Sequence, residues 1–358
     1  MRIKFLLMIL MLVPVTMAWA KKEQCTVYGI APQGATSITV FDSQTRKQVA
    51  IVPVADGMFT YTVKQNDEMF YSFFDKASRK VNYIVADGDS VNLDMPADRA
   101  SGTPLNEQLY AQCDSLMRRY RVYLSTRDRV RNALSPDEAK QLREQSLQQQ
   151  AEADRYLEAL VQQHENDCLA PFFVMAQCNS MSFETLERLC LSKGRYTRHA
   201  IFGKVRKSYE RQKQDRALLD KPFIDVPVKD ALGKTHKLSE FVGKGKYVLV
   251  DFWASWCGPC MREMCNLKSC YKKYKDRGFE IIGISLDSER QSWLAAISGK
   301  ELFWSHYSDL SRFECPAART YNVRSIPWCF LCDPEGKIIA VGLRGDELRE
   351  KLVEVLGR

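Results

Sequence analysis

An apolar run that leads directly into a Cys-x-x-Cys motif constrains this chain more than any other feature. Residues 250–256 (VDFWASW) have the composition of a buried strand, and the motif Cys257-Gly258-Pro259-Cys260 opens a helical pattern. Free backbone N–H groups and the positive end of the dipole in a first helical turn favour an anion. We therefore expect the pKa of Cys257 to lie below its free value of about 8.5. Cys260 lies one turn later, where its thiol can attack a mixed disulfide on Cys257.

A Cys-x-x-Cys motif is also half of a zinc site, and a second pair, Cys329 and Cys332, lies downstream. We reject zinc because this second pair falls in an apolar, strand-like run, whose period of two sends the two thiols to opposite faces. Neither motif is followed closely by a histidine. The sequence therefore predicts no metal ligands among these residues.

Residues 1–20 have the features of a secretory signal peptide. A basic start precedes the apolar run 5–15, and Ala18-Trp19-Ala20 supplies a small-x-small cleavage site. The alternative is an uncleaved membrane anchor, but the run is shorter than the roughly 20 apolar residues that a spanning helix needs. We expect an exported protein of the periplasm or cell envelope.

Composition limits the remaining possibilities. The formal net charge is +8, but basic residues alternate with acidic ones along the chain, so we expect no nucleic-acid partner. A chain of 358 residues is too long for one ordinary core. All twelve cysteines follow the predicted cleavage site, and many could pair in an oxidising compartment, with a connectivity that their spacing leaves open.

Composition and hydrophobic periodicity divide the mature chain into three segments. Residues 21–100 alternate apolar and polar positions between Asp-Gly turns, which predicts an antiparallel β-rich domain of six or seven strands. Residues 101–219 place Leu, Gln, Arg and Glu at helical spacing, with a helix start at Ser135, which predicts a helical region. Residues 220–358 alternate strand and helix patterns, which predicts helices on both faces of a central sheet.

Within the last segment the elements can be placed individually. We expect strands near residues 246–252, 279–285, 328–332 and 337–342. We expect helices near residues 257–276, 288–298, 314–321 and 346–356. The turn sequence at 333–336 favours a hairpin between the last two strands.

Residues 220–358 resemble the TlpA/ResA-like thiol-disulfide oxidoreductases, thioredoxin-fold proteins of bacterial envelopes that are related to the AhpC/TSA group. The resemblance rests on the active-site segment, which is similar to that of thioredoxin down to Asp251, and on Glu263, Ser285-Leu286-Asp287, residues 321–327 (YNVRSIP) and residues 333–339 (DPEGKII). It implies an α/β thioredoxin fold that follows a small antiparallel β domain and a helical region. It implies no activity for residues 21–219.

The resemblance also implies roles for individual residues. Cys257 would be the nucleophile and Cys260 the resolving thiol, joined in a redox-active disulfide that serves in place of any other cofactor. Ile326-Pro327 would be a cis-proline loop that faces the motif, although an ordinary trans proline at a strand start is the alternative. The implied substrate-binding residues are Trp256, Gly258, Pro259, Ile326, Pro327 and Trp328.

Two carboxylates are candidates for moving the proton of Cys260. Helical spacing puts Glu263 on one face with Cys260 and Leu267, where an unpaired glutamate should have a raised pKa. Asp251 lies in an otherwise apolar strand and matches the buried aspartate of thioredoxin. The alternatives are a surface glutamate at position 263 and a partnered core carboxylate at position 251.

The chain departs from the family pattern at several positions. Cys265 replaces a usual proline, so the active-site helix should be straighter, and Trp328 replaces a usual small residue or threonine. A ring at that position would narrow the substrate groove, unless it packs inward as core. We first interpret Cys265, Cys315 and Cys329 as small buried hydrophobic residues, with a second redox pair as the alternative.

We therefore expect an exported oxidoreductase that reduces cysteine-containing envelope proteins and takes electrons from an upstream membrane or periplasmic thiol donor. Gly-Pro between the cysteines resembles thioredoxin and favours a reductant. The alternatives are an envelope copper chaperone that uses the two thiols with His306, and a peptide-binding protein that uses only the groove. A peroxidase is disfavoured because the residues before Cys257 lack the Pro-x-x-x-Thr-x-x-Cys approach to its thiolate.

Overall fold

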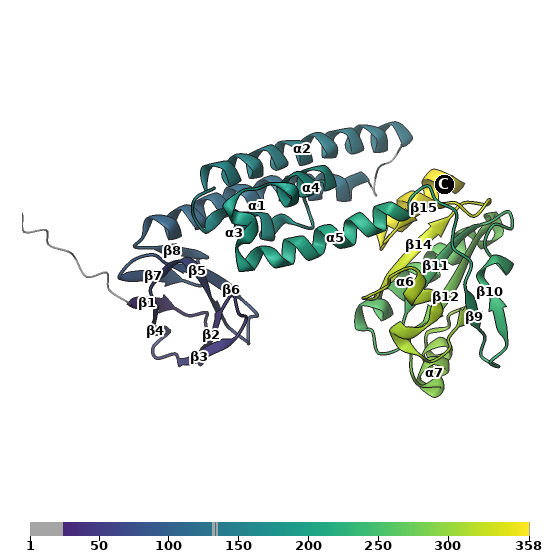
Figure 1. Ribbon diagram of the computed structural model, residues 1–358, viewed down its shortest axis with the longest axis horizontal. Coiled ribbons are helices and arrows are strands. Elements are labelled where there is room, and N and C mark those ends of the chain that lie inside the picture. The colour runs from purple at the N-terminus through teal and green to yellow at the C-terminus, as the bar shows by residue number, and fades with distance from the viewer. Residues whose placement is uncertain (1–23, 131–132, 134, 358) are drawn as a thin grey trace, which may run out of the picture. The chain divides into compact units, whose positions relative to one another are not determined.

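The computed structural model describes residues 24–130, 133 and 135–357 (Figure 1). The described chain contains strands, then helices, then an alternation of both. The described chain forms two compact units, each built from several segments of the sequence. The first holds the residues up to Arg121 with Glu152–Ser180 and Leu191–Lys204. The second holds Val122–Ala151, Met181–Cys190 and the residues from Val205 onward.

The N-terminal β segment forms two four-stranded sheets around one core. The sheet orders are β4-β1-β7-β8 and β3-β2-β5-β6. The strands are β1 (Gln24–Ile30), β2 (Ser37–Asp42), β3 (Gln48–Pro53), β4 (Met58–Lys64), β5 (Asn66–Phe74), β6 (Val81–Ala86), β7 (Ser90–Asp94) and β8 (Arg99–Ser101). Val27 and Val91 from the first sheet share this core with Val40 and Phe73 from the second. The strands pair in antiparallel fashion as predicted, except that β1 and β7 pair in parallel across the length of the segment. The described residues form eight strands here, where six or seven were predicted.

The helical region follows directly. Its elements are α1 (Pro104–Val130), α2 (Pro136–Gln163), α3 (Leu169–Gln177), α4 (Phe183–Leu191), η1 (Arg195–Arg198), η2 (Ala200–Phe202) and α5 (Gly203–Leu218). The side chain of Ser135 caps α2 by accepting a hydrogen bond from the backbone of Glu138, at 3.1 Å. Helices α1 and α2 each contribute turns to both compact units, because 27 or 28 residues of helix span roughly 40 Å. The predicted helical segment is therefore continuous in secondary structure but is not a compact unit by itself.

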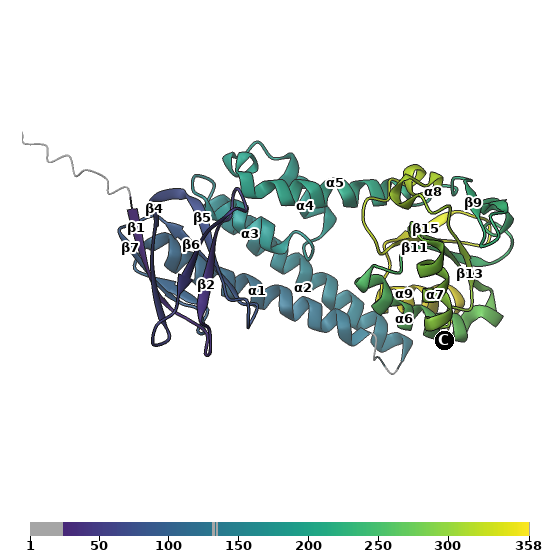
Figure 2. The same ribbon diagram turned by 90° about the horizontal axis from the view of Figure 1, so that it is seen from below.

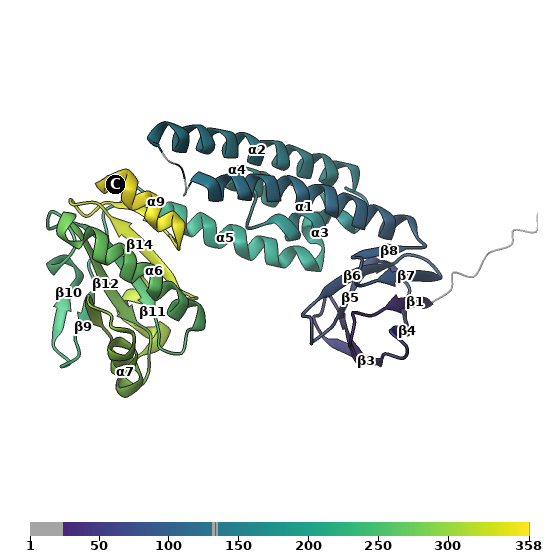
Figure 3. The ribbon, with the colours of Figure 1, turned by 180° about the vertical axis from the view of Figure 1, so that it is seen from behind.

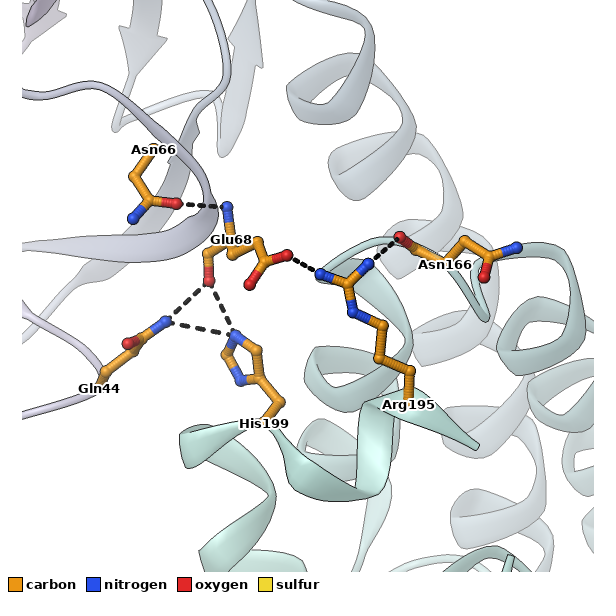
Figure 4. A network of polar contacts seen from close by, with 6 residues as sticks. All are labelled: Gln44, Asn66, Glu68, Asn166, Arg195 and His199. Atoms are coloured by element: carbon orange, nitrogen blue, oxygen red, sulfur yellow. Dashed lines mark hydrogen bonds and ion pairs between the residues drawn. The ribbon is translucent and has the colours of Figure 1, made fainter. Parts of the chain in front are cut away.

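A polar network joins β5 to η1 and η2 within the first unit (Figure 4). Arg195 forms an ion pair with Glu68 and also donates to the carbonyl of Asn166. The backbone oxygen of Glu68 lies 2.7 Å from Nε2 of Gln44 and 2.8 Å from Nε2 of His199. These contacts hold the irregular start of β5, where the register with β6 shifts, against the short 3-10 helices.

The C-terminal segment is a five-stranded sheet in the order β13-β12-β11-β14-β15. Its strands are β11 (Tyr247–Trp253), β12 (Phe279–Ser285), β13 (Ser305–Tyr307), β14 (Trp328–Cys332) and β15 (Ile338–Val341). Its helices are α6 (Gly258–Tyr274), α7 (Arg290–Lys300), α8 (Pro316–Thr320) and α9 (Asp346–Leu356). The central strand β11 runs parallel to β12 and antiparallel to β14. Helices α6 and α9 cover one face of the sheet and α8 covers the other (Figure 2).

This topology is that of a thioredoxin fold, and it agrees with the predicted strands and helices to within a few residues. The predicted hairpin of β14 and β15 is present. The hairpin of β9 (Pro227–Lys229) and β10 (Thr235–Lys237), like β13, was not predicted, because three residues are too few to show an alternation. Helix α6 packs along the sheet in contact with β12 (Figure 3), and residues 254–257 connect the end of β11 to the start of α6.

No helix in the described part of the chain is long and apolar enough to cross a membrane. The predicted signal peptide, residues 1–20, lies outside the described residues.

Candidate active site

The Cys-x-x-Cys motif lies where the central strand gives way to a helix. Strand β11 ends at Trp253 and α6 begins at Gly258, so Cys257 occupies the N-cap position. Its Sγ accepts the backbone N–H of Cys260 at 3.2 Å, which meets one of the free donors of the first turn. Pro259 suits this turn because its missing N–H would have no intrahelical partner. Strand, turn and helix start thus place the sulfur of Cys257 at the positive end of α6.

Cys257 and Cys260 form a disulfide, with their Cα atoms 5.2 Å apart. Cys257 is 5% exposed and Cys260 is 1% exposed. Cys257 is therefore buried in this oxidised form, in which its sulfur is bonded to Cys260 at the helix start. The exposed surface beside the disulfide comes instead from Gly258, Pro259 and Trp256. Trp256 is 55% exposed.

The peptide bond between Ile326 and Pro327 is cis, as the family resemblance implied. Strand β14 follows immediately, and its first residue, Trp328, is the register partner of Phe252. Pro327 therefore lies beside the end of β11, at the edge of the sheet from which the Cys257 turn extends. Ile326 is half-buried and Pro327 is buried.

Asp251 is a buried carboxylate behind the motif. It is 4% exposed, and its Oδ2 has no hydrogen-bond partner among the described residues. Burial raises the pKa of Asp251 to about 7, with a further increase from the negative charge of Glu263 and an opposing effect from Arg344. A carboxyl group with a pKa near neutrality can exchange a proton in either direction at physiological pH.

Glu263 lies on α6, half-buried, and is not the unpaired glutamate that we expected. Its Oε1 accepts a hydrogen bond from Nδ2 of Asn266 at 2.7 Å and another from the backbone N–H of Gly345 at 2.8 Å. The second partner is distant in sequence and could not be anticipated from helical spacing. Its charge acts on Asp251, so the two candidate carboxylates do form one electrostatic group.

Asp287 is a buried residue beside the site to which the sequence interpretation gave no role. Its buried carboxylate accepts hydrogen bonds from the backbone N–H of Ser255 at 3.0 Å, from the Ser255 hydroxyl at 2.6 Å and from the Ser285 hydroxyl at 2.7 Å. These charge-assisted bonds fix the turn that carries Cys257. The available signal was the Ser-Leu-Asp segment at 285–287, which contributed only to the family resemblance.

Similar proteins are known for the C-terminal part of the chain. A family model described as the AhpC/TSA family matches residues 219–341. The thiol-disulfide oxidoreductase ResA of Bacillus thuringiensis subsp. konkukian is 32% identical over 144 residues, which are 40% of this chain and 80% of the relative. ResA of Bacillus subtilis is 30% identical over 114 residues, 32% of this chain and 61% of the relative. A solved thiol-disulfide oxidoreductase from Bacteroides fragilis is 33% identical, with 38% of this chain and all of that chain covered (100%) and a TM-score of 0.36.

The chain belongs to the ResA-like thiol-disulfide oxidoreductases. This family of the thioredoxin superfamily accounts for the C-terminal domain, and the protein is a thiol-disulfide oxidoreductase. The alternatives of a copper chaperone and a redox-inactive peptide-binding protein are not favoured.

Trp328 of this ResA-like protein does not line the substrate groove, and that interpretation is wrong. Its ring packs inward as core, which was the alternative. The residue is 8% exposed, and its ring packs between Phe252, Tyr321 and Phe330, with centroid distances of 5.5 to 6.2 Å. Register partners in a sheet point to the same face, and Phe252 faces the core. The indole N–H donates to Asp215 on α5 at 3.1 Å, which satisfies the one polar atom of the ring.

Cys265, Cys315 and Cys329 of this ResA-like domain differ in environment. Cys315 and Cys329 are buried, as expected for small hydrophobic residues, whereas Cys265 is exposed on α6. Burial raises the pKa of Cys315 to about 11 and raises the pKa of Cys329 further. These two thiols are therefore poor nucleophiles in the folded domain.

His306, the ligand considered for a copper site, lies on β13 within an aromatic cluster. The rings of Trp253 and Trp304 lie 5.3 Å and 5.5 Å from its imidazole. Burial lowers the pKa of His306 to about 3, and neither ring nitrogen has a hydrogen-bond partner among the described residues. Across the described ranges, no three His, Cys, Asp or Glu side chains gather in a group that could hold a metal ion.

Proposed function

We propose that this protein is an exported reductase of disulfides in cysteine-containing envelope proteins, working through a Cys257/Cys260 dithiol-disulfide cycle. The observation that carries the proposal is the position of Cys257 at the N-cap of α6, with Cys260 bonded behind it and cis Pro327 beside the same edge of the sheet. A helix N-terminus supports a thiolate, and an adjacent second thiol releases the substrate.

The cycle begins when the reduced protein presents the Cys257 thiolate to a substrate disulfide. The thiolate attacks one substrate sulfur, the substrate S–S bond breaks, and a mixed disulfide forms while the first substrate sulfur leaves as a thiolate. Cys260 then loses its proton and attacks Sγ of Cys257, which releases the second substrate thiolate. The substrate gains two electrons and the protein regains its Cys257–Cys260 disulfide.

Asp251 and Glu263 are proposed to accept the proton of Cys260 and to return it during reduction of the protein. Asp251 has a pKa near 7, so at neutral pH it is present in both protonation states. Glu263 is half-buried and hydrogen-bonded, and its charge acts on the buried acid. Proton transfer is therefore assigned to the pair.

Substrate is proposed to bind as an extended segment along the cis-proline loop. The backbone of Ile326 would pair with the segment, and the exposed surfaces of Trp256, Gly258 and Pro259 would contact it beside the disulfide. Trp328 is excluded from this surface because its ring lies in the core.

Export, electron supply and partners complete the proposal. Residues 1–20 would direct the chain to the periplasm or envelope. A membrane or periplasmic thiol protein would reduce the Cys257–Cys260 disulfide, which needs no further cofactor, and no nucleic acid is involved.

A trapping experiment tests the proposal. In cells that express Cys260→Ser, the mixed disulfide on Cys257 cannot be resolved, so covalent adducts with envelope proteins should accumulate and disappear on treatment with dithiothreitol. Cys257→Ser serves as the matched control and should trap nothing. Adducts on the control variant, or adducts confined to cytoplasmic proteins, would contradict the proposal.

The reduction potential of the pair tests its direction. A potential near the reducing end of the range, around −270 mV, fits a reductant, whereas one near −120 mV fits an oxidant. The second result would leave the thiol chemistry in place and overturn the assignment as a reductase.

A further inference from the structure

The short segment 342–345, between β15 and α9, is attached to both sides of the active site. On one side it binds β14. The backbone N–H of Gly342 donates to the carbonyl of Cys329 at 2.7 Å, and the Cys329 thiol donates to the carbonyl of Leu343 at 3.2 Å. We call residues 342–345 the bridging loop. Gly342 has a φ of +72°, a left-handed value that glycine adopts without strain.

On the other side the bridging loop binds the active-site helix. The backbone N–H of Gly345 donates to Oε1 of Glu263 at 2.8 Å, and Nδ2 of Asn266 donates to the carbonyl of Gly345 at 3.0 Å. Gly345 also has a positive φ of +52°. The loop therefore fixes the strand that follows the cis proline relative to the helix that carries Cys260.

Arg344 is the charged residue of the bridging loop, and its guanidinium reaches back to the cis-proline segment. It donates a hydrogen bond to the carbonyl of Pro327. Its positive charge also lowers the pKa of Asp251 and of Cys329, against the larger effect of burial on both. One side chain thus contacts the backbone beside the substrate groove and acts on the buried acid behind the disulfide.

The groups around Asp251 come from each element packed against it. Glu263 on α6 contributes a negative charge, and Cys329 on β14 lies opposite Asp251 in register as a neutral thiol. Arg344 supplies the opposing positive charge, and it also acts on Asp215 of α5. The positive charge of Arg344 opposes the effects of burial and of the Glu263 charge, both of which disfavour ionisation of Asp251.

We propose that Arg344 is a positioning residue for disulfide exchange, which holds the Pro327 carbonyl in place and keeps the Asp251–Glu263 pair able to accept the Cys260 proton near neutral pH. The inference rests on the proposed role of that pair. Glu263 and Arg344 also line an open cavity of about 320 Å³, so the Glu263 member of the pair can exchange protons with water.

The test separates the two steps of exchange in the full-length protein. Pre-reduced protein is mixed with 5,5′-dithiobis(2-nitrobenzoate) from pH 5 to 9. The first release of thionitrobenzoate reports attack by Cys257, and the second reports attack by Cys260. A Cys257→Ser/Cys260→Ser protein measures the background from the other thiols, and thermal unfolding confirms that each variant is folded.

Arg344→Gln removes the charge and should move the pH midpoint of the second release upward by about one unit, since one nearby opposite charge shifts a carboxyl pKa by roughly 1–3 units. If the midpoint moves from about 7 to about 8, the deprotonated fraction of the acid at pH 7 falls from about one half to about one eleventh, so the second release should be about fivefold slower. Arg344→Lys keeps the charge and should restore the midpoint. Arg319→Gln, at an exposed ion pair with Glu314, is the matched control and should behave as the unmodified protein.

Each outcome bears on the inference. A folded Arg344→Gln protein with an unchanged midpoint overturns it, as does a lysine variant shifted as far as the glutamine variant. The shift should vanish when Arg344→Gln is combined with Asp251→Asn, and its persistence would show that Arg344 does not act through the acid. If the unmodified protein releases no second thionitrobenzoate above background, the proposed dithiol cycle itself fails, which is a distinguishable result.

Discussion

Replacing the buried acid Asp251 with asparagine should stabilise the C-terminal domain at high pH and not at low pH. Asp251 has a pKa of about 7 in the folded protein, compared with 3.8 in its ordinary state. Between these values the folded protein holds a proton that the unfolded chain has released. The unfolded state therefore binds fewer protons, and stability falls as pH rises from about 4 to about 7.

The size of the effect follows from the difference between the two values. Three pKa units correspond to about 4 kcal/mol, at 1.36 kcal/mol per unit. Asp251 is fully buried, so solvent screens little of this energy. Asparagine remains neutral at every pH and resembles the protonated acid. The free energy of unfolding of Asp251→Asn should therefore match that of the unmodified protein near pH 4 and exceed it by about 4 kcal/mol above pH 8.

Urea unfolding of the oxidised proteins at several pH values measures the difference. Five of the six tryptophans lie between residues 253 and 328, so tryptophan fluorescence reports on the C-terminal domain. Glu314→Gln, at a carboxylate whose side chain is 68% exposed, controls for the loss of an acid at the surface. A stability difference for Asp251→Asn that stays constant from pH 4 to pH 8 would refute the reasoning.

Three further variants test the rest of the site. Glu263→Gln keeps an oxygen that can accept from Gly345 but removes the charge that raises the pKa of Asp251. The pH midpoint of the second thionitrobenzoate release, which reports attack by Cys260, should therefore fall. An unchanged pH profile would leave Glu263 with a structural role only. Trp328→Ala should lower the free energy of unfolding by about 3–5 kcal/mol, as for other buried aromatic side chains, and should leave the order of preference among peptide disulfides unchanged. A changed order of preference with no loss of stability would show that the ring does line the substrate groove. Asp287→Asn should lower the free energy of unfolding by about 2–3 kcal/mol, because an amide cannot accept all the hydrogen bonds that the buried carboxylate receives. Amide hydrogen exchange in the turn before Cys257 should become faster. Unchanged exchange there would show that other contacts hold the turn.

Local patterns were sufficient to predict the catalytic motif and the framework around it. The apolar run before Cys257 and the helical pattern after it are properties of neighbouring residues, and the strand-helix alternation from residue 220 onward is of the same kind. The cis bond before Pro327 was predicted from family resemblance, because a proline alone rarely implies it.

Other features depend on contacts between residues that are far apart in the sequence. The parallel pairing of β1 with β7 has no local signal, since it joins the two ends of the β segment. The direction of the Trp328 ring follows from its register with Phe252 and from the acceptor that Asp215 offers on α5. The Glu263 carboxylate is paired by Gly345, which lies 82 positions later.

The sequence by itself determined that this chain carries a thioredoxin-like dithiol at a helix start, because periodicity and motif spacing act over a few residues. Only the tertiary structure decided which groups surround that dithiol. Burial and nearby charge depend on everything packed against a side chain, and together they raise the pKa of Asp251 and of Cys329. The hydrogen bond from Arg344 to the Pro327 carbonyl likewise joins residues that are distant in the sequence. Proton transfer at the site therefore depends on the folded domain, whereas the capacity for dithiol-disulfide exchange is predicted by the spacing of Cys257 and Cys260 alone.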